Sequence, residues 1–288
     1  MRNALPAELA HRWMRIPNWI QVEVGQIKYY CPWHFHTSRM VDCGFSTRVG
    51  GVSRGPYSSL NLSLAVGDDA ASVLENRRLF ADALEVDPNR IVVPNQVHSP
   101  TVFRVIQEDA GRGALDHATA IPDTDALITN VPETPLALHF ADCVGVFFLD
   151  PVNRAIGVAH AGWRGTVDEI VIATVQAMTG EFGSRPGDIL AAISPAIERH
   201  CFEVEEDVAK QFLELFSVNE RILTASSSTK WRVDLGAANL MMLKRAGLDE
   251  SNIAISEQCT SCNSSEFFSY RRDGETGRMG GWLSLRHV

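Results

Sequence analysis

Three short segments place a histidine or a cysteine where an apolar run gives way to a loop: residues 95–98 (NQVH), 141–143 (ADC) and 160–165 (HAGWRG). The residues with reactive side chains are His98, Cys143 and His160. Such a set is compatible with a three-ligand zinc site whose fourth position stays open. It is equally compatible with a cysteine nucleophile and a histidine base, or with three unrelated strand ends. The spacing alone leaves these alternatives open.

Polar residues beside these segments are candidates for proton transfer and substrate binding. Asp142 precedes Cys143 and is a candidate general base or a group that orients a metal ligand, the alternative being a carboxylate that caps a turn. Arg48, next to a glycine pair, and Arg164 are candidates for phosphate, because a guanidinium fork matches its geometry. We add Gln96 as a candidate substrate contact.

Three other patterns match known motifs only by their letters. Residues 51–55 read GVSRG, but Pro56 follows, so we interpret Ser53 as part of a turn and not as a nucleophile. Residues 34–36 (HFH) are predicted to form a strand near the surface. We do not interpret them as a copper site, because one HxH pair among 9 histidines cannot form a four-copper site. Residues 259–262 (CTSC) could be half of a zinc site or a redox pair. Because no second CxxC motif completes a structural zinc site, we expect no such site and no obligatory disulfide there. The remaining histidines considered, which we expect to be structural or exposed, are His117, His139 and His200.

The composition restricts the classes of partner. The 288 residues include 26 Lys+Arg and 35 Asp+Glu, a net charge of −9, with no dense basic block, so we expect no nucleic-acid or membrane partner. The apolar runs are only as long as strands. The first twenty residues lack the apolar core of a signal peptide, so we expect a cytoplasmic protein whose six cysteines are thiols or ligands. Monomer and homodimer both remain open.

Hydrophobic periodicity predicts the elements that position these residues. Strands are expected at residues 125–129, 135–142, 144–150 and 155–160, and the short turns between them favour antiparallel pairing. Helices are expected at 69–84, from a capping box at 166–169 to Gly183, at 205–216 and at 234–246. The predicted fold is mixed α/β, with largely antiparallel sheets and flanking helices. Residues 1–40 look less regular and are expected to pack as an extension on a single domain of residues 41–288.

Several longer segments resemble the YfiH family, also called laccase-domain proteins, multicopper polyphenol oxidoreductases or peptidoglycan editing factors. They occur in order between about Cys43 and Arg278 and include STRVGGVSRGPYSSLNL, NQVHS, ADC, HAGWRGT and FFSYRRDGETGR. The resemblance implies a fold related to the catalytic domain of cytotoxic necrotizing factor toxins. It also implies a zinc site whose ligands match His98, Cys143 and His160.

The activities that the resemblance implies are phosphorolysis of adenosine, inosine and methylthioadenosine, and deamination of adenosine. The implied partners are therefore purine nucleosides and phosphate. Copper-dependent oxidation of phenols and editing of peptidoglycan precursors are alternatives, as is a cysteine hydrolase. The chain departs from the usual family pattern at Val144-Gly145 and at residues 194–197 (SPAI), both near the expected pocket.

Overall fold

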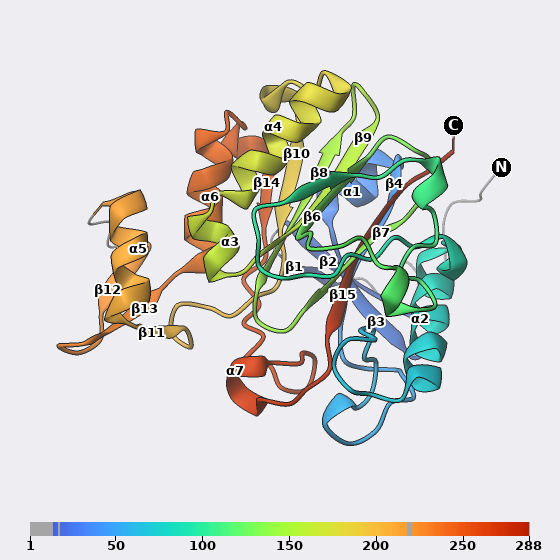
Figure 1. Cartoon of the computed structure of the whole chain (residues 1–288), viewed down its shortest axis with the longest axis horizontal. Coiled ribbons are helices and arrows are strands. Elements are labelled where there is room, and N and C mark those ends of the chain that lie inside the picture. Colours follow the sequence, from blue (N-terminus) through green and yellow to red (C-terminus); the bar gives the residue numbers. More distant parts are fainter. Residues whose placement is uncertain (1–13, 17, 218–220, 288) are drawn as a thin grey trace.

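The computed structural model describes residues 14–16, 18–217 and 221–287. In these residues two six-stranded sheets and one three-stranded sheet combine with helices, which confirms the predicted mixed α/β class (Figure 1). No helix in this part of the chain is both long and apolar enough to span a membrane.

The first sheet is antiparallel throughout. Part of the expected N-terminal extension belongs to it: residues 14–16, 19–24 and 27–32 form three strands, while residues 1–13 and 17 lie outside the described residues. Trp19 is fully buried against Phe147 of the second sheet. In spatial order the strands are β1 (Met14–Ile16), β2 (Trp19–Val24), β3 (Ile27–Pro32), β4 (Val41–Ser46), β15 (Met279–Leu285) and β7 (Leu136–Phe140).

The second sheet has an antiparallel centre and a parallel pair at each edge. Its two central strands are buried along their whole length, because the first sheet covers one face and helices cover the other. Their continuous apolar sequence follows from this double covering. In spatial order the strands are β14 (Ile253–Ile255), β10 (Leu190–Ile193), β8 (Val144–Asp150), β9 (Ala155–Ala161), β6 (Ala126–Thr129) and β5 (Val102–Arg104).

The connection from β7 to β8 passes from one sheet to the other. The predicted antiparallel pairing holds for β8 with β9, but β7 pairs with β15 and not with its neighbours in the sequence. Only residues 141–143 make the crossing, and Asp142 adopts a left-handed φ of 91° there. This tight corner places Cys143 where the two sheets meet.

Helices cover the outer faces of the sheets. α2 (Ala70–Leu84), α5 (Glu206–Phe216) and α6 (Leu235–Arg245) agree with the predicted helices to within one residue at each end. α4 (Ile170–Phe182) packs on β9 and β6, and α6 packs on α4. The shorter helices are α1 (Trp33–Ser38), α3 (Trp163–Val167) and α7 (Tyr270–Asp273).

Two local predictions are wrong. The expected capping box at residues 166–169 is absent: Thr166 lies inside α3, its N–H bonded to the carbonyl of Gly162, and Glu169 has a left-handed φ of 58°. The chain is already helical from Trp163 onward, so Thr166 cannot begin a helix. The HFH segment is the helix α1 and not a strand, and it buries Phe35.

A small unit projects from the second sheet. Its strands are β11 (Glu203–Glu205), β13 (Lys230–Val233) and β12 (Leu223–Ala225), and α5 packs on them at the left of Figure 1. Phe212 and Phe216 of α5 stack on each other and belong to the same hydrophobic core as residues of α4 and α6. The unit is therefore anchored through its apolar side.

Candidate active site

The structure brings the three strand-end residues together. His98 lies in the loop before β5, Cys143 at the corner between β7 and β8, and His160 in β9. Pairing of β8 with β9 sets Gly145 opposite His160, which places the imidazole beside the start of β8. Cys143 Sγ is 4.0 Å from His98 Nε2, and the two imidazole centroids are 4.9 Å apart. One ligand atom of each residue lies within 4.8 Å of the others.

Asp125 orients both histidines, and the sequence analysis missed it. Its Oδ1 is 2.8 Å from His160 Nδ1, while its Oδ2 accepts the N–H groups of Val97 (2.9 Å) and Ser99 (2.8 Å) on either side of His98. These bonds hold His98 at its left-handed φ of 63°. The available signal was a carboxylate at the start of a buried strand, a position at which an unpaired charge is costly.

Without a metal, the pKa values of Cys143 and His160 shift in the directions that favour a thiolate and an imidazolium. Burial alone raises the pKa of Cys143, but His160 and His98 outweigh burial and lower this pKa from 9.0 to about 6. Burial alone lowers the pKa of His160, but Cys143 and Asp125 outweigh it and raise this pKa from 6.5 to about 9. The site therefore stabilises a thiolate, the form of cysteine that binds metals and attacks electrophiles.

The glycine of the HAGWRG segment makes room for this arrangement. A Cβ atom on Gly162 would lie 2.9 Å from Cys143 Sγ and 3.0 Å from His98 Cδ2. Gly162 has a φ of −65°, so its backbone does not require glycine. The requirement is steric.

Asp142 bonds to a different part of the chain. Its carboxylate accepts hydrogen bonds from Thr260 Oγ1 (2.7 Å), Ser269 Oγ (3.0 Å) and the N–H of Arg271 (2.6 Å). The carboxylate that orients His160 is thus Asp125. Asp142 fastens the C-terminal loops to the corner that carries Cys143.

Gln96 and Arg48 make structural contacts that the sequence analysis did not predict. Gln96 exchanges two hydrogen bonds with the backbone of His139, which fixes the 95–98 loop to β7. Arg48 donates to the carbonyls of Ser58 (2.9 Å) and Ser264 (3.3 Å) and lies over the Phe268 ring. Arg48 therefore joins two loops.

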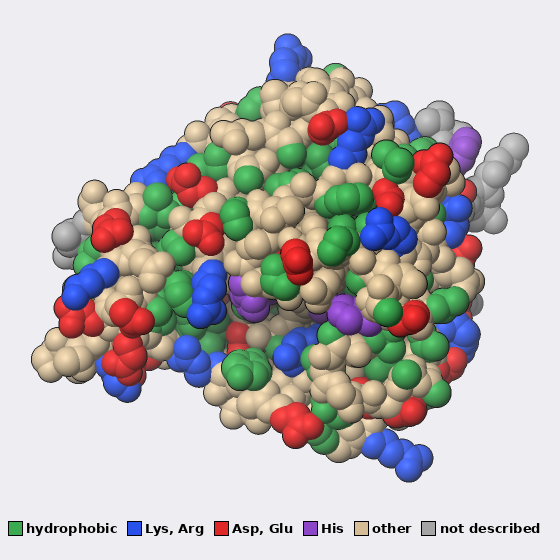
Figure 2. Space-filling model, in the orientation of Figure 1, with side chains coloured by type: hydrophobic (Ala, Val, Ile, Leu, Met, Phe, Trp, Pro, Cys, Tyr) green, Lys and Arg blue, Asp and Glu red, His purple; other side chains and the backbone are tan. Residues whose placement is uncertain are grey.

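Arg164 and Arg278 are further candidates to bind an anion. Arg164 is exposed and stacks on Trp163, with its guanidinium carbon 4.3 Å from the ring centroid. Burial lowers the pKa of Arg278, and the negative charges of Cys143 and Asp142 oppose this effect, so its guanidinium lies within electrostatic reach of the site. Figure 2 shows histidine side chains beside a hollow near the centre of this face, with Lys or Arg side chains along its border.

Ser53 lies in a segment without regular structure, just before a short 3-10 helix. Its hydroxyl donates to Asp68 at 2.6 Å and accepts from Asn76 at 2.8 Å, and one turn of 3-10 helix (Gly55–Tyr57) follows. These contacts leave Ser53 in a structural network and not at a strand-to-helix elbow.

Comparisons with known proteins agree with this fold and show the family of the chain. A sequence model of the family described as "Multi-copper polyphenol oxidoreductase laccase" matches residues 42–286. Purine nucleoside phosphorylase YlmD of Bacillus subtilis (strain 168) is 39% identical over 252 residues, covering 87% of this chain and 91% of that protein. Adenosine deaminase RL5, from an unknown prokaryotic organism, is 37% identical over 232 residues, covering 80% of this chain and 88% of that protein.

A solved structure gives the same result for the fold. YlmD from Geobacillus stearothermophilus has a TM-score of 0.85 at 36% identity, and the match covers 95% of this chain and 98% of that chain. The chain belongs to the laccase-domain family, also called the YfiH family, as the sequence segments predicted. Its relatives include proteins named as purine nucleoside phosphorylases and as an adenosine deaminase.

Proposed function

We propose that this chain is a zinc-dependent purine nucleoside phosphorylase that acts on adenosine, inosine and methylthioadenosine and also deaminates adenosine. The observation that carries the proposal is the convergence of His98, Cys143 and His160 around one point, with Asp125 fixing both histidines. The names of the relatives supply the reaction class.

The donor set fits zinc. Asp125 accepts the Nδ1 proton of a neutral His160, so Nε2 of His160 is left as the ligand atom, beside Nε2 of His98 and the thiolate of Cys143. One sulfur and two nitrogens are a usual set for a catalytic zinc with a fourth, open position. Zinc bound there would act as a Lewis acid toward a water or a substrate oxygen.

The remaining residues would bind substrate and hold protons. Arg164 and Arg278 would supply guanidinium groups for phosphate near C1′ of the ribose. Arg48 stays a third candidate for phosphate, although its guanidinium also donates to the carbonyls of Ser58 and Ser264. Asp142 remains a candidate base only if it releases one of its three donors. The hydrogen bond between Asp125 and Nδ1 of His160 fixes both the tautomer and the orientation of the imidazole, so the ring cannot rotate away from the reacting atoms.

A cysteine hydrolase is the second candidate, favoured by one observation. In the metal-free protein the Cys143 thiolate, the His160 imidazolium and the Asp125 carboxylate form a chain of the kind used for nucleophilic catalysis. A copper oxidase has less support, because the HFH pair of α1 belongs to neither His/Cys cluster of the described residues.

The test resolves products. Zinc-loaded protein is incubated with adenosine, with and without phosphate, and adenine, inosine and hypoxanthine are separated by chromatography. We expect adenine only when phosphate is present, inosine under both conditions, and neither product from Cys143→Ala.

Each rival gives a different result. Turnover that survives chelation of the metal and disappears on alkylation of Cys143 would establish the hydrolase. Oxidation of a phenol by copper-loaded protein without nucleoside turnover would establish the oxidase. No turnover in any arm would leave a binding protein.

A further inference from the structure

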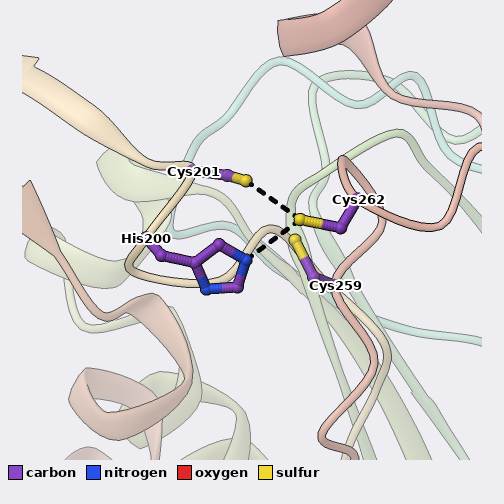
Figure 3. A group of neighbouring side chains, drawn as sticks. All are labelled: His200, Cys201, Cys259 and Cys262. Carbon is purple, nitrogen blue, oxygen red and sulfur yellow. Dashed lines mark hydrogen bonds between the residues drawn. The ribbon is translucent and has the colours of Figure 1, made fainter.

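A second cluster of metal-binding side chains lies outside the site described above. His200 and Cys201 are in the connection between β10 and β11, and Cys259 and Cys262 are between β14 and α7. His200 Nε2 is 3.0 Å from Cys262 Sγ, and Cys201 Sγ is 3.3 Å from the same sulfur (Figure 3). One ligand atom of each residue lies within 4.8 Å of the others.

We propose that His200, Cys201, Cys259 and Cys262 bind a structural zinc ion. Three thiolates and one imidazole form a complete tetrahedral set for zinc, and four protein ligands leave no open position for catalysis. Soft sulfur donors exclude magnesium and calcium. Zinc–sulfur bonds of about 2.3 Å place tetrahedral sulfurs about 3.8 Å apart, so a small outward movement of Cys201 and Cys262 admits the ion.

The backbone already joins the two loops in register. Ala196 and Cys259 form a parallel bridge, in which Ala196 N–H donates to the carbonyl of Gln258 at 3.2 Å and Thr260 N–H donates to the carbonyl of Ala196 at 3.0 Å. The N–H of Glu198 points at Cys259 Sγ at 3.5 Å, a contact that strengthens when the sulfur is a thiolate. The ligands thus stand on a fixed frame.

A disulfide would involve fewer of these four side chains than a zinc ion would. It would join two of the three sulfurs and leave one thiol and His200 beside it without a shared partner. Zinc uses all four donors, and all six cysteines are free thiols in the structure. The two half-sites come from segments about 60 residues apart in the sequence, which is why a search for paired CxxC motifs misses them.

The position of the cluster indicates which parts of the structure the ion would stabilise. Both loops contact the residue before Cys143: Thr260 Oγ1 bonds to the Asp142 carboxylate, and Ile197 N–H donates to the Asp142 carbonyl at 2.9 Å. Cys201 also lies two residues before β11, the first strand of the unit that projects from the body (Figure 1). Zinc bound here would hold these two loops together. They support the corner that carries Cys143, and one of them leads into the projecting unit.

Metal analysis of Cys143→Ala tests the inference, because this change disables the first site. We expect about one zinc per chain in this variant and loss of that zinc in Cys143→Ala/Cys262→Ser. Cys262 is exposed, so its replacement leaves the core intact. Ser261→Ala in the Cys143→Ala background is the matched control and should keep the zinc.

Cobalt gives a second readout that needs no activity. Cobalt-loaded Cys143→Ala should show the intense charge-transfer absorption of several thiolates. Adding Cys201→Ala to this variant should weaken that absorption. The inference is overturned by a zinc-free Cys143→Ala chain, by iron in place of zinc, or by a disulfide within residues 201–262 found by mass spectrometry under non-reducing conditions. None of these results depends on whether the protein cleaves nucleosides.

Discussion

Cys143 and His160 carry opposite charges over a defined pH range in the metal-free protein. The pKa of Cys143 is lowered to about 6, so its contribution to stability is complete above its unfolded value of 9.0 and is lost as the pH falls through about 6. The pKa of His160 is raised to about 9, so its contribution is complete below 6.5 and is lost as the pH rises through about 9. Both residues are therefore charged between about pH 6 and pH 9.

This ion pair predicts the reactivity of Cys143. In chelated protein, alkylation of Cys143 by iodoacetamide should rise with pH around a midpoint near 6, and the urea-unfolded chain should show the ordinary midpoint near 9. The rate at each pH is measured by mass spectrometry of the peptide that contains Cys143. Added zinc should protect the thiolate. A midpoint above 8 in the folded protein would contradict the pairing with His160.

Arg48 and Arg164 should differ in what their removal changes. Arg48→Ala leaves two carbonyls without a donor and should lower the free energy of unfolding by about 1–3 kcal/mol. Arg164→Ala should change this free energy by no more than ~0.5 kcal/mol, yet lower kcat/KM for phosphate by one to two decades, about 1.5–3 kcal/mol. Arg164→Lys should recover part of that loss.

Urea unfolding and phosphate-dependent adenosine cleavage, measured on the same three variants, separate these effects. Wild-type phosphate kinetics in Arg164→Ala would assign the phosphate to Arg278 or Arg48. An unchanged unfolding midpoint in Arg48→Ala would remove its structural role.

Hydrophobic periodicity and helix caps predicted those elements that are determined by neighbouring residues in the sequence. α2 and α6 begin where Asp69 and Asp234 accept backbone N–H groups, and such caps are legible in the sequence. The three strand-end residues followed from apolar runs and a family resemblance. Asp125 and the pair His200–Cys201 were missed because their partners are set by the register of distant strands, which periodicity does not reveal.

The two departures from the usual family pattern also meet through strand register. Ser194 Oγ accepts the N–H of Gly145 at 2.9 Å, and Ser194 N–H donates to the Gly145 carbonyl at 2.9 Å. A Cβ atom on Gly145 would lie 3.1 Å from that hydroxyl oxygen. The residues at these two positions are therefore complementary to each other, and they lie next to Cys143.

The turn from β9 into α3 predicts a purely steric effect on metal binding. In Gly162→Ala the new methyl group would meet Cys143 Sγ and His98 at about 3 Å, so zinc at the first site should be lost while the fold remains. Gly180→Ala in α4 is the matched control, because nothing lies within 4 Å of its added Cβ and it should keep full zinc. Zinc content and circular dichroism are compared for both. Full zinc at the first site in Gly162→Ala would show that the close approach is not required.

For the molecule as a whole, the crossing between the two sheets creates the site. β7 ends in the first sheet, β8 begins in the second, and the corner between them carries Cys143 toward His98 and His160. The C-terminal loops return to this corner through Asp142, and β15 lies beside it through its pairing with β7.

We propose that His98, Cys143 and His160 hold a zinc ion at which nucleosides react. The most direct measurement is an anomalous-difference map from crystals of active, zinc-loaded protein, recorded on both sides of the zinc absorption edge. We expect a zinc peak bounded by these three side chains, which disappears together with nucleoside turnover in Cys143→Ala. Active crystals without a zinc peak between His98, Cys143 and His160 would contradict it.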